Sequence, residues 1–458
     1  MDDNRIVILG AGESGFGSAY LAKQKGFNVF VTDYGTIKDV YKQKLIENEI
    51  EFEEGGHTLD KILNASEVIK SPGIPDSVDV IIKIKEQGIN IISEIEFAGR
   101  YTSAKNICVT GSNGKTTTAT LIYSILKNGG INVGLAGNIG HSFAYQVATE
   151  EFDWYVLELS SFQLDNIYNF KVDIAIMTNI TPDHLDRYDY DLSKYVASKF
   201  RIIKNQTESS FFICSMDDKV IDEYINEKNP VIFAKQLYVS VKEAVLEGAF
   251  ITEDGMINVS YNDTEWLYDA KKLQIKGIHN IYNAQTASIA AMLVGVSEET
   301  IDKTLSEFTG VEHRLEPVIE DNGVLFINDS KATNIDSAWY ALQAMTRPVI
   351  WIAGGKDKGN DYTTLYDVVK GKVSTLICMG TDNEKISEAF KGVVPFIYHT
   401  SSIQDAVERS RIVSKKGDCV LLSPACASFD LFKNYEDRGI QFKAEVMKHI
   451  NNNASTKE

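Results

Sequence analysis

The segment from Gly111 to Thr118 constrains the fold of this chain more than any other stretch. It reads Gly-Ser-Asn-Gly-Lys-Thr-Thr-Thr, follows a β-rich apolar run and precedes a helix-like segment. Glycines let backbone N–H groups converge on phosphate oxygens, and the N-terminus of the following helix adds partial positive charge. The full P-loop pattern has another glycine where Val109 stands, so this is a shortened version. The segment predicts an α/β fold with a phosphate-binding loop.

Composition indicates a chain of several folded domains. It has 458 residues, 44% of them hydrophobic, and a formal net charge of −18. At about 100–200 residues per domain, this length suggests two to four domains. No apolar run reaches the ~18–20 residues of a membrane helix, and the N-terminus does not resemble a secretory signal. The acidic charge disfavours general binding to nucleic acid. We expect a cytoplasmic monomer without membrane insertion.

The cysteines are scattered and odd in number, and none forms a CxxC pair. A disulfide framework or zinc site is therefore not expected, and the side chains are predicted to be small buried residues. They are Cys108, Cys214, Cys378, Cys419 and Cys426.

Strand-like and helix-like segments alternate along the chain, and the pattern restarts twice. Such alternation is typical of parallel sheets covered by helices. We predict an N-terminal Rossmann-like domain over 1–103, a central P-loop ATPase-like domain over 104–310 and a C-terminal Rossmann-like α/β domain over 311–458. Shorter segments between about 208 and 275 predict an added, partly antiparallel section. Residues 279–295 look like a long helix.

The first strand-to-helix turn, Gly-Ala-Gly-Glu-Ser-Gly at 10–15, fits a dinucleotide-binding fingerprint. Asp33 follows at about the spacing expected for a ribose-binding acid. The loop at 71–74 ends a later strand of the same sheet. Tight packing alone would also require these glycines, so NAD, a nucleotide-linked substrate and a purely structural role all stay open.

A second polar cluster follows the P-loop along the chain. Glu158 ends one strand-like run, His184 follows the next, and Lys199 lies in a helix-like segment. An acid and a histidine at neighbouring strand ends could hold magnesium beside bound phosphates. Taken singly, His184 and Lys199 would fit an ordinary surface or packed position.

Further polar groups stand at strand ends in the second half of the chain. They lie at 279–283, 313–314, 328–334, 354–358 and 423–430. Each could be an ordinary loop, but together they favour a ligand site at one sheet edge.

These motifs resemble those of the Mur ligases of peptidoglycan synthesis, and among them the D-glutamate-adding members. GSNGKTTT, ELSSFQL, NITPDHLDRY, HNIYNA, NDSKATN and LLSPACASFD occur in the family's order over nearly the whole chain. The resemblance implies three domains and an ATP-dependent amide-forming ligase. Its implied substrates are UDP-N-acetylmuramoyl-L-alanine and D-glutamate, joined through an acyl phosphate with two Mg²⁺ ions.

The resemblance also implies roles for matched residues. The implied catalytic residues are Lys115, His184 and Lys199. The implied ATP contacts are Gly111, Ser112, Asn113, Gly114, Lys115, Thr116, Thr117, Asn280, Asn283, Arg314 and Asp329. Those for the UDP substrate are Gly12, Glu13, Ser14, Asp33, Ser71, Gly73, Asn138, Ser160 and His184. Those for D-glutamate are Lys331, Thr333, Lys358, Ser428, Phe429 and Tyr435. The implied metal ligands are Thr116, Glu158, His184 and Lys199, the last as a carbamate.

The chain departs from the family pattern at two places. Tyr435 stands where phenylalanine is expected, beside the implied amino-acid site. The segment Asp-Tyr-Gly at 33–35 lacks a basic residue found in some uracil pockets, so uracil contacts are the least defined part of the resemblance.

Three other functions would each account for part of the sequence. A ligase of the same architecture could add another amino acid or extend folate, although the 328–334 and 354–358 segments argue against it. An NAD-dependent oxidoreductase would use the 10–15 loop but leave the P-loop unexplained. A P-loop nucleotide switch would not need the later motifs.

Overall fold

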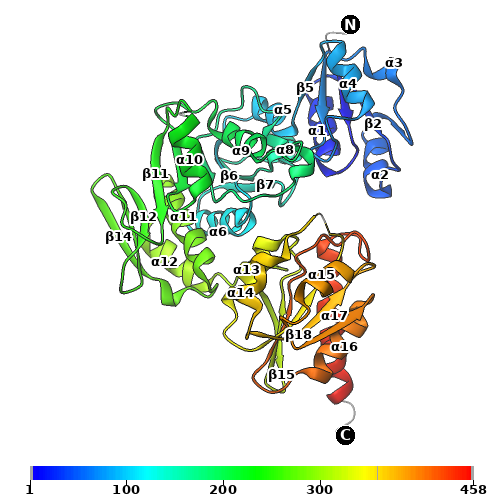
Figure 1. The fold of residues 1–458 in the computed structure, drawn as a ribbon. Helices are drawn as coiled ribbons and strands as arrows, with labels where there is room; N and C mark the ends of the chain where they lie inside the picture. The colour runs from blue at the N-terminus through cyan, green and yellow to red at the C-terminus, as the bar shows by residue number, and fades with distance from the viewer. Residues whose placement is uncertain (1–3, 229, 358, 455–458) are drawn as a thin grey trace. The chain divides into compact units, whose positions relative to one another are not determined.

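A computed structural model of the chain describes residues 4–228, 230–357 and 359–454. The chain divides into two compact units (Figure 1). The first comprises Met1–Leu273 and Asn280–Phe308, and the second comprises Gln274–His279 and Thr309–Glu458. The chain forms three sheets, two of them in the first unit, and the bounds of the three predicted domains stay a prediction.

The first sheet is parallel, with the strand order β3-β2-β1-β4-β5. Its strands are β1 (Arg5–Leu9), β2 (Asn28–Asp33), β3 (Glu51–Glu54), β4 (Glu67–Lys70) and β5 (Asn90–Ile92). Its helices are α1 (Glu13–Gln24), α2 (Asp39–Glu47), α3 (Leu59–Ile62), α4 (Asp79–Glu86) and α5 (Glu94–Ala98). The chain leaves β1 for β2 on one side and reaches β4 on the other. This reversal of strand order opens a crevice at the strand ends, where ligands bind in such sheets.

The second sheet has the order β14-β13-β12-β11-β10-β9-β6-β8-β7. Strands β6 to β12 pair in parallel, whereas β12, β13 and β14 pair antiparallel. The predicted antiparallel addition is therefore confirmed. The strands are β6 (Lys105–Thr110), β7 (Val133–Gly137), β8 (Trp154–Glu158), β9 (Ile174–Met177), β10 (Phe211–Ser215), β11 (Lys235–Ser240), β12 (Gly248–Ile251), β13 (Met256–Tyr261) and β14 (Thr264–Asp269).

Helices cover this second sheet, and the predicted long helix near 279–295 is confirmed as α11. The helices are α6 (Lys115–Asn128), α7 (Phe143–Thr149), α8 (Ser161–Leu164), α9 (Leu192–Phe200), α10 (Lys219–Lys228), α11 (Ile278–Val294) and α12 (Glu298–Glu307). Short 3₁₀ turns η1 to η5 span Gly99–Tyr101, Leu185–Arg187, Arg201–Ile203, Ala270–Lys272 and Tyr362–Leu365. Strands β6, β8 and β9 are almost wholly buried, which explains their continuous apolar sequence.

Helix α5 fastens the first sheet to the second. One Glu96 carboxylate oxygen accepts the backbone N–H groups of Tyr168, Asn169 and Phe170, at 3.0, 3.0 and 2.9 Å. The Glu94 carboxylate accepts the Ala144 N–H at 3.1 Å and the Ser142 hydroxyl at the start of α7. Burial raises the pKa of Glu94 to about 7, and the Ser142 hydrogen bond opposes this rise. These contacts hold the two sheets' strand-end loops within one unit.

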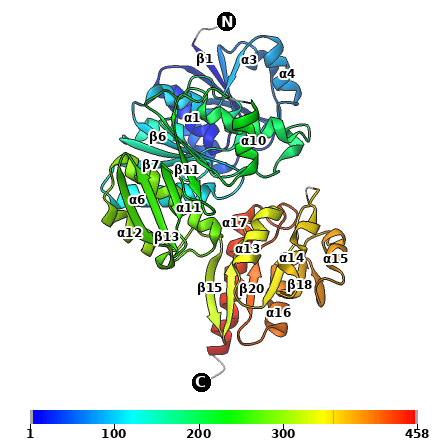
Figure 2. The same cartoon turned by 60° about the vertical axis from the view of Figure 1, so that its left-hand side comes forward.

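The third sheet lies in the second unit, with the order β15-β16-β20-β17-β18-β19 (Figure 2). Only the edge strand β15 pairs antiparallel. The strands are β15 (Glu316–Asp321), β16 (Val324–Asn328), β17 (Val349–Ala353), β18 (Val373–Met379), β19 (Phe396–Thr400) and β20 (Cys419–Leu422). The helices are α13 (Ile335–Ala344), α14 (Tyr366–Val369), α15 (Glu384–Phe390), α16 (Ile403–Val413) and α17 (Tyr435–Ala454). Separate apolar clusters cover the two faces.

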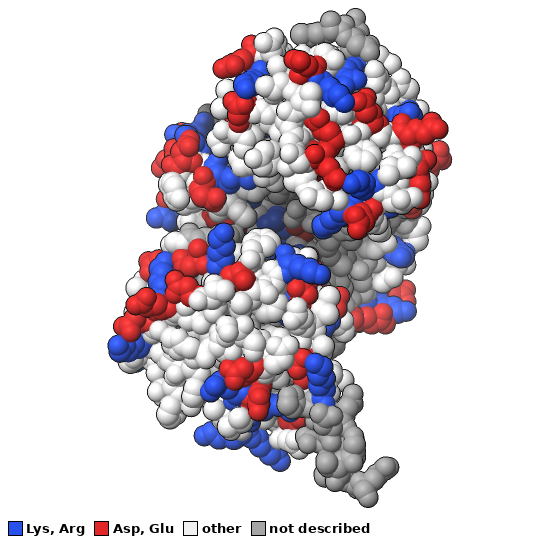
Figure 3. Space-filling model, turned by 90° about the vertical axis from the view of Figure 1, so that its right-hand side faces the viewer, with Lys and Arg blue, Asp and Glu red and all other residues white. Residues whose placement is uncertain are grey.

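The cysteines, the helices and the charged surface residues bear on the expectations drawn from composition. All five cysteines are buried and unbridged, as predicted. Within the described ranges, no helix is both long and apolar enough to cross a membrane. On the face drawn in Figure 3, basic side chains lie interspersed with acidic ones.

Candidate active site

The P-loop connects β6 to α6 and depends on two glycines. Gly111 has φ +143° and Gly114 has φ +83°, a backbone region that favours glycine. A Cβ at Gly111 would lie 2.0 Å from Thr178 Oγ1, and one at Gly114 would lie 2.8 Å from Asn283 Oδ1. Thr116 and Thr117 are buried at the start of α6. The loop thus has the strand–turn–helix setting that the sequence predicts.

The segment 178–181, directly after β9, braces the P-loop. Asn113 N–H donates to Asn179 Oδ1 at 2.9 Å, and the Thr178 hydroxyl donates to the Asn113 carbonyl at 2.6 Å. The Ser112 hydroxyl donates to the Thr181 carbonyl at 2.8 Å. The sequence motif NITPDHLDRY contains Asn179 and Thr181 but predicted no bracing role for them, and Thr178 was not predicted to belong to the site. Their position after the strand adjacent to β6 was the available signal.

Two lysines converge on the carbonyl of Gly111. Lys115 Nζ donates to it at 2.9 Å and to the Ser112 carbonyl at 2.7 Å. Lys199 Nζ, from α9, donates to the same Gly111 carbonyl at 2.6 Å. The structure therefore brings together Lys115 and Lys199, which are 84 positions apart in the chain (199 − 115).

Lys199 is buried, with 2% of its surface exposed, and its ammonium lies 4.5 Å from the Tyr195 ring centre. Burial, together with the nearby Lys115 cation, lowers the pKa of Lys199 well below its usual value. A lowered pKa favours the neutral amine. Only a neutral amine is nucleophilic enough to add CO₂, so this environment suits a carbamate.

Glu158 lies buried at the end of β8 and contacts Asn138. Asn138 Nδ2 donates to Glu158 Oε1 at 2.9 Å, and Asn138 N–H donates to the Glu158 carbonyl at 2.8 Å. Ser160 caps α8, with a capping box to Gln163. The structure places Asn138, Glu158 and Ser160 along one strand-end edge.

His184 has a left-handed backbone, with φ +53°. Its Nε2 lies 3.7 Å from Asp183 Oδ2, and its ring packs edge-on against Phe162 at 5.2 Å. Thr116 and Glu158 offer the hard oxygen donors that Mg²⁺ prefers, and a Lys199 carbamate would add another. The donor set thus fits magnesium, with the His184 nitrogen as its least typical member.

Helix α11 places its asparagines beside the P-loop helix. Thr118 Oγ1 donates to Asn283 Oδ1 at 3.0 Å, and Asn283 Nδ2 donates to Asn280 Oδ1 at 2.9 Å. Both predicted α11 contacts for ATP are therefore joined to α6. Arg314 and Asp329 belong to the second unit, so their part in the same site stays a prediction.

The glycines of the 10–15 loop differ in how much space a Cβ atom would find at each position. Gly10 has φ +91°, and a Cβ there would lie 2.6 Å from Ser71 Oγ. A Cβ at Gly15 would lie 1.9 Å from the Gly10 carbonyl oxygen, whereas one at Gly12 would meet nothing within 4 Å. At the start of α1, Gly12 and Glu13 are exposed and Ser14 is partly exposed.

We expect Gly15→Ala to lower the free energy of unfolding by about 1–3 kcal/mol, the cost of forcing a methyl group into packed backbone. Gly12→Ala, in the same loop, should change it by less than ~0.5 kcal/mol. Urea denaturation of both variants measures the difference. Equal stability of the two would contradict the packing argument.

Asp33 braces the same turn. Its two carboxylate oxygens accept the N–H groups of Ala11 and Gly35, at 2.8 and 2.9 Å. A pocket of about 680 Å³ opens beside it. Its lining residues are Gly10, Asp33, Tyr34, His57, Leu59, Gly73, Ile74, Pro75, Val78, Asp79 and Val80. None of these described lining residues is Lys or Arg, so the pocket suits an uncharged planar group rather than phosphate.

Arg187 connects this pocket to the central sheet. Its guanidinium donates to the carbonyls of Gly73 and Ile74, both at 3.2 Å. Arg187 lies three residues beyond His184, so the 71–74 loop and the His184 segment are held together in one unit. Sequence reasoning did not assign this role to Arg187.

The second unit carries the residues predicted for the amino acid. The Lys331 ammonium lies 5.3 Å from the Tyr435 ring centre, and Ser428 is buried. Thr333 is partly buried, and Phe429 is 68% exposed. Lys358 lies outside the described residues. The predicted departure, Tyr435, starts α17 and packs edge-on against His313.

Asp329 directly follows β16 and is buried. Burial raises the pKa of Asp329 to about 7, and the Ser423 hydroxyl, donating at 2.8 Å, opposes the rise. Leu315 N–H donates to the other carboxylate oxygen at 3.1 Å. This carboxyl group therefore anchors the 313–315 segment to the end of β20.

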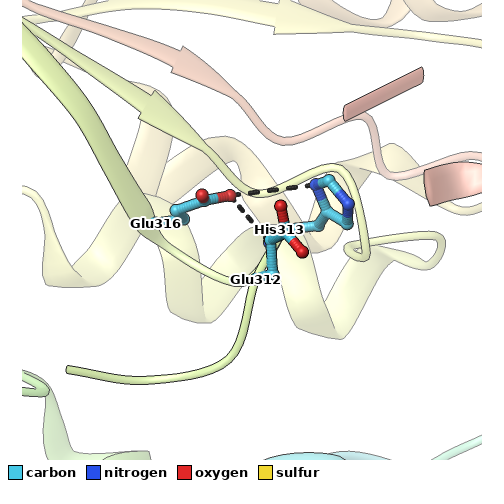
Figure 4. A group of neighbouring side chains, drawn as sticks. All are labelled: Glu312, His313 and Glu316. Atoms are coloured by element: carbon cyan, nitrogen blue, oxygen red, sulfur yellow. Dashed lines mark hydrogen bonds and ion pairs between the residues drawn. The ribbon is translucent and has the colours of Figure 1, made fainter. Parts of the chain in front are cut away.

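Glu312, His313 and Glu316 form a compact group in the second unit (Figure 4). Lys443 pairs with both glutamates, at 2.9 Å from Glu316. Asn328 Nδ2 donates to Glu316 Oε2 at 3.0 Å and lies 2.9 Å from His313 Nδ1. Because Lys443 and Asn328 already occupy carboxylate oxygens of this group, we interpret it as a structural contact between the 312–316 segment, β16 and α17.

Comparison with known proteins identifies the class of this chain. The Mur ligase middle domain matches residues 109–291, and the Mur ligase glutamate ligase domain matches residues 313–426. The chain belongs to the Mur ligase family and is an ATP-dependent ligase. The oxidoreductase and nucleotide-switch alternatives are thereby set aside.

The N-terminal domain and the full-length relatives match one kind of ligase within this family. The MurD N-terminal domain matches residues 5–80. The UDP-N-acetylmuramoylalanine–D-glutamate ligase of Christiangramia forsetii is 52% identical over 442 residues, covering 96% of this chain and 99% of that protein. The enzyme of the same name from Bacteroides thetaiotaomicron is 54% identical over 444 residues, with the same coverage.

Solved structures share the fold at low sequence identity. The UDP-N-acetylmuramate-alanine ligase of Thermotoga maritima superposes with a TM-score of 0.61 at 16% identity, covering 98% of this chain and 99% of that one. A MurF ligase of the same organism, in complex with ADP, gives 0.60 at 16% identity, covering 98% of this chain and all of that one. The predicted three-domain α/β architecture is confirmed.

Proposed function

We propose that this enzyme joins D-glutamate to UDP-N-acetylmuramoyl-L-alanine, with ATP converted to ADP and phosphate. The observation that carries the proposal is the convergence of Lys115 and Lys199 on Gly111 of the P-loop. The chain that contains this arrangement aligns over 96% of its length with ligases of that name. The reaction would supply a peptidoglycan precursor. ATP and UDP-linked precursors are cytoplasmic metabolites, so it belongs in the cytoplasm.

The first chemical step activates a carboxylate. A carboxylate oxygen of the UDP substrate attacks the γ-phosphorus of ATP, the bond to the β,γ-bridging oxygen breaks, and ADP leaves. The product is an acyl phosphate. Lys115, freed from the loop carbonyls, would offset charge on the transferring phosphoryl group. Backbone N–H groups at the start of α6 would hold the remaining phosphates.

Magnesium, when bound, offsets phosphate charge and aligns the reacting oxygens. The residues proposed to hold two Mg²⁺ ions are Thr116, Glu158, His184 and carbamylated Lys199. A free Lys199 ammonium would repel a cation, whereas its carbamate is an anionic oxygen donor. The burial and lowered pKa of Lys199 support this assignment.

The second step forms the amide. The neutral D-glutamate nitrogen attacks the acyl carbon, the carbon–oxygen bond to phosphate breaks, and a base takes the proton from nitrogen. His184 is one candidate for this base, a role that competes with its proposed role as a metal ligand. Lys331 and Lys358 would pair with the two glutamate carboxylates, and Thr333 and Ser428 would donate hydrogen bonds. Phe429 and Tyr435 would border the amino acid.

The first unit would bind the UDP substrate. The pocket beside Asp33 suits the base, and the loop at Gly12, Glu13 and Ser14 lies at a helix N-terminus suited to the diphosphate. Ser71 and Gly73 would also contact the UDP part of the substrate. Asn138, Ser160 and His184 would face the muramoyl part.

Mass spectrometry of the reaction product tests this proposal. The enzyme is incubated with ATP, Mg²⁺, UDP-N-acetylmuramoyl-L-alanine and D-glutamate. We expect one glutamyl residue to be added, and ADP to form in equal amount. An unchanged UDP substrate under these conditions would refute the proposed function.

A further inference from the structure

Arg438, in the first turn of α17, is a buried arginine on which sequence reasoning placed no role. Only 1% of its surface is exposed. Its Nε donates to Ser330 Oγ at 2.9 Å, and Nη2 donates to the Ser330 carbonyl at 2.8 Å. Nη1 and Nη2 both donate to the Cys426 carbonyl at 3.3 Å. One guanidinium therefore joins two loops, 328–334 and 423–430.

Ser330 is the centre of this arrangement. It is fully buried, and its hydroxyl donates to the Tyr435 carbonyl at 2.8 Å while accepting from Arg438. Its backbone N–H donates to Asn328 Oδ1 at 3.2 Å. Lys331 and Thr333, both proposed to bind the amino acid, follow it directly. The start of α17 thus fixes the backbone from which these two side chains project.

The second loop contains a strained residue that needs support. Ala425 has φ +58°, a left-handed conformation that is unfavourable for a residue with a Cβ. Such residues persist only where their surroundings hold them, and they are concentrated at functional sites. Arg438 binds the next carbonyl, that of Cys426, and Asn360 Nδ2 donates to the Ala425 carbonyl at 3.0 Å. Ser428 and Phe429 lie just beyond this turn.

A third loop is connected through the same cysteine. The Tyr362 hydroxyl lies 3.2 Å from Cys426 Sγ and donates to Asp357 Oδ2 at 2.8 Å. Lys356 N–H donates to the Ala427 carbonyl at 2.8 Å. The loop bearing the predicted Lys358 is therefore tied to the one that Arg438 holds.

We propose that Arg438 is a positioning residue for the amino-acid substrate, holding the 328–334 and 423–430 loops in the geometry that binds D-glutamate. It acts through Ser330 and Cys426, because its burial excludes contact with substrate. A planar guanidinium can donate to both loops at once, whereas a lysine ammonium would lose this fork. Burial lowers the pKa of Arg438 to about 10, so the group remains charged at neutral pH.

The inference rests on the proposed function, and variants of the full-length enzyme separate the two. Arg438→Met and Arg438→Lys remove the fork at similar side-chain length. Arg411→Met is the matched control. Arg411 is also largely buried in the second unit and bonds α17, donating to the Val446 carbonyl at 2.9 Å and to Asp321 at 2.6 Å. It touches neither loop in the described contacts. Thermal unfolding of each variant reports any general loss of stability.

We expect both Arg438 variants to raise the KM for D-glutamate roughly 10- to 100-fold, the effect of losing charge-assisted hydrogen bonds. The dissociation constant for the UDP substrate, measured by calorimetry, should stay within about twofold, because the first unit binds it. Arg411→Met should lower the unfolding temperature without raising that KM. An unchanged KM, or the same rise in Arg411→Met, would overturn the positioning role. If the unsubstituted enzyme fails to ligate D-glutamate, the proposed function itself fails.

Discussion

Lys115→Met is expected to slow ATP-dependent phosphate release by about 10²–10³-fold, the loss typical of removing one group that stabilises developing charge. In the structure Lys115 Nζ donates to two carbonyls of its own loop, those of Gly111 and Ser112. On the proposed mechanism, phosphate oxygens of ATP would replace these carbonyls as partners of the ammonium group. The fold should tolerate the change, because methionine preserves the stem of this partly exposed side chain.

Lys127→Met provides the matched control for this experiment. Lys127 lies on the same helix, α6, but in its last turn and exposed to solvent. Phosphate release by this variant should equal that of the unsubstituted enzyme within about twofold. Comparable rates for Lys115→Met and Lys127→Met would contradict the role given to the P-loop lysine.

Lys199→Ala is expected to cause a loss of similar size, about 10²–10³-fold, because it removes both the proposed metal ligand and its negative charge. Unlike Lys115→Met, this variant should regain activity when short carboxylates such as acetate or formate are added. A small carboxylate can occupy the space left by the side chain and supply the anionic oxygen. Steady-state rates with increasing acetate measure the rescue.

Lys194→Ala is the control for the second prediction. Lys194 lies on the same helix, α9, and pairs with Asp189 at 2.6 Å on the exposed side. Neither a loss of activity nor an acetate effect is expected for it. Full activity of Lys199→Ala would remove Lys199 from the mechanism. Inactivity that no carboxylate restores would refute the carbamate and leave only a structural role.

Much of the parallel core could be predicted, because buried strands leave a continuous apolar signal. The run Asn28–Asp33 became β2, and the runs before Gly111 and around Glu158 became β6 and β8. Edge strands were harder to predict from the sequence. β3 reads Glu-Phe-Glu-Glu and has no buried residue, so its sequence resembles a loop. β15 reads Glu-Pro-Val-Ile-Glu-Asp, and its proline and terminal acids also make it difficult to predict as a strand.

Those parts of the candidate site that consist of one short motif could be predicted from the sequence. The P-loop and the glycines at 10 and 15 are local features, so their residue types revealed them. The bracing of Asn113 by Thr178 and Asn179, and of two loops by Arg438, arises between segments distant in sequence. No local pattern indicates which of many polar residues will meet. Asp33 also accepts two backbone N–H groups and so stabilises the turn. The prediction of a ribose-binding acid did not include this structural role.

Phosphate release from ATP, measured with UDP-N-acetylmuramoyl-L-alanine and D-glutamate, L-glutamate, L-lysine or glycine in turn, tests the central claim most directly. We predict release with D-glutamate alone, and none when either the UDP substrate or the amino acid is omitted. Release with a different amino acid would keep the ligase chemistry but contradict the assignment of Lys331, Thr333 and Ser428 to D-glutamate. Absence of release with all of them would contradict the account as a whole.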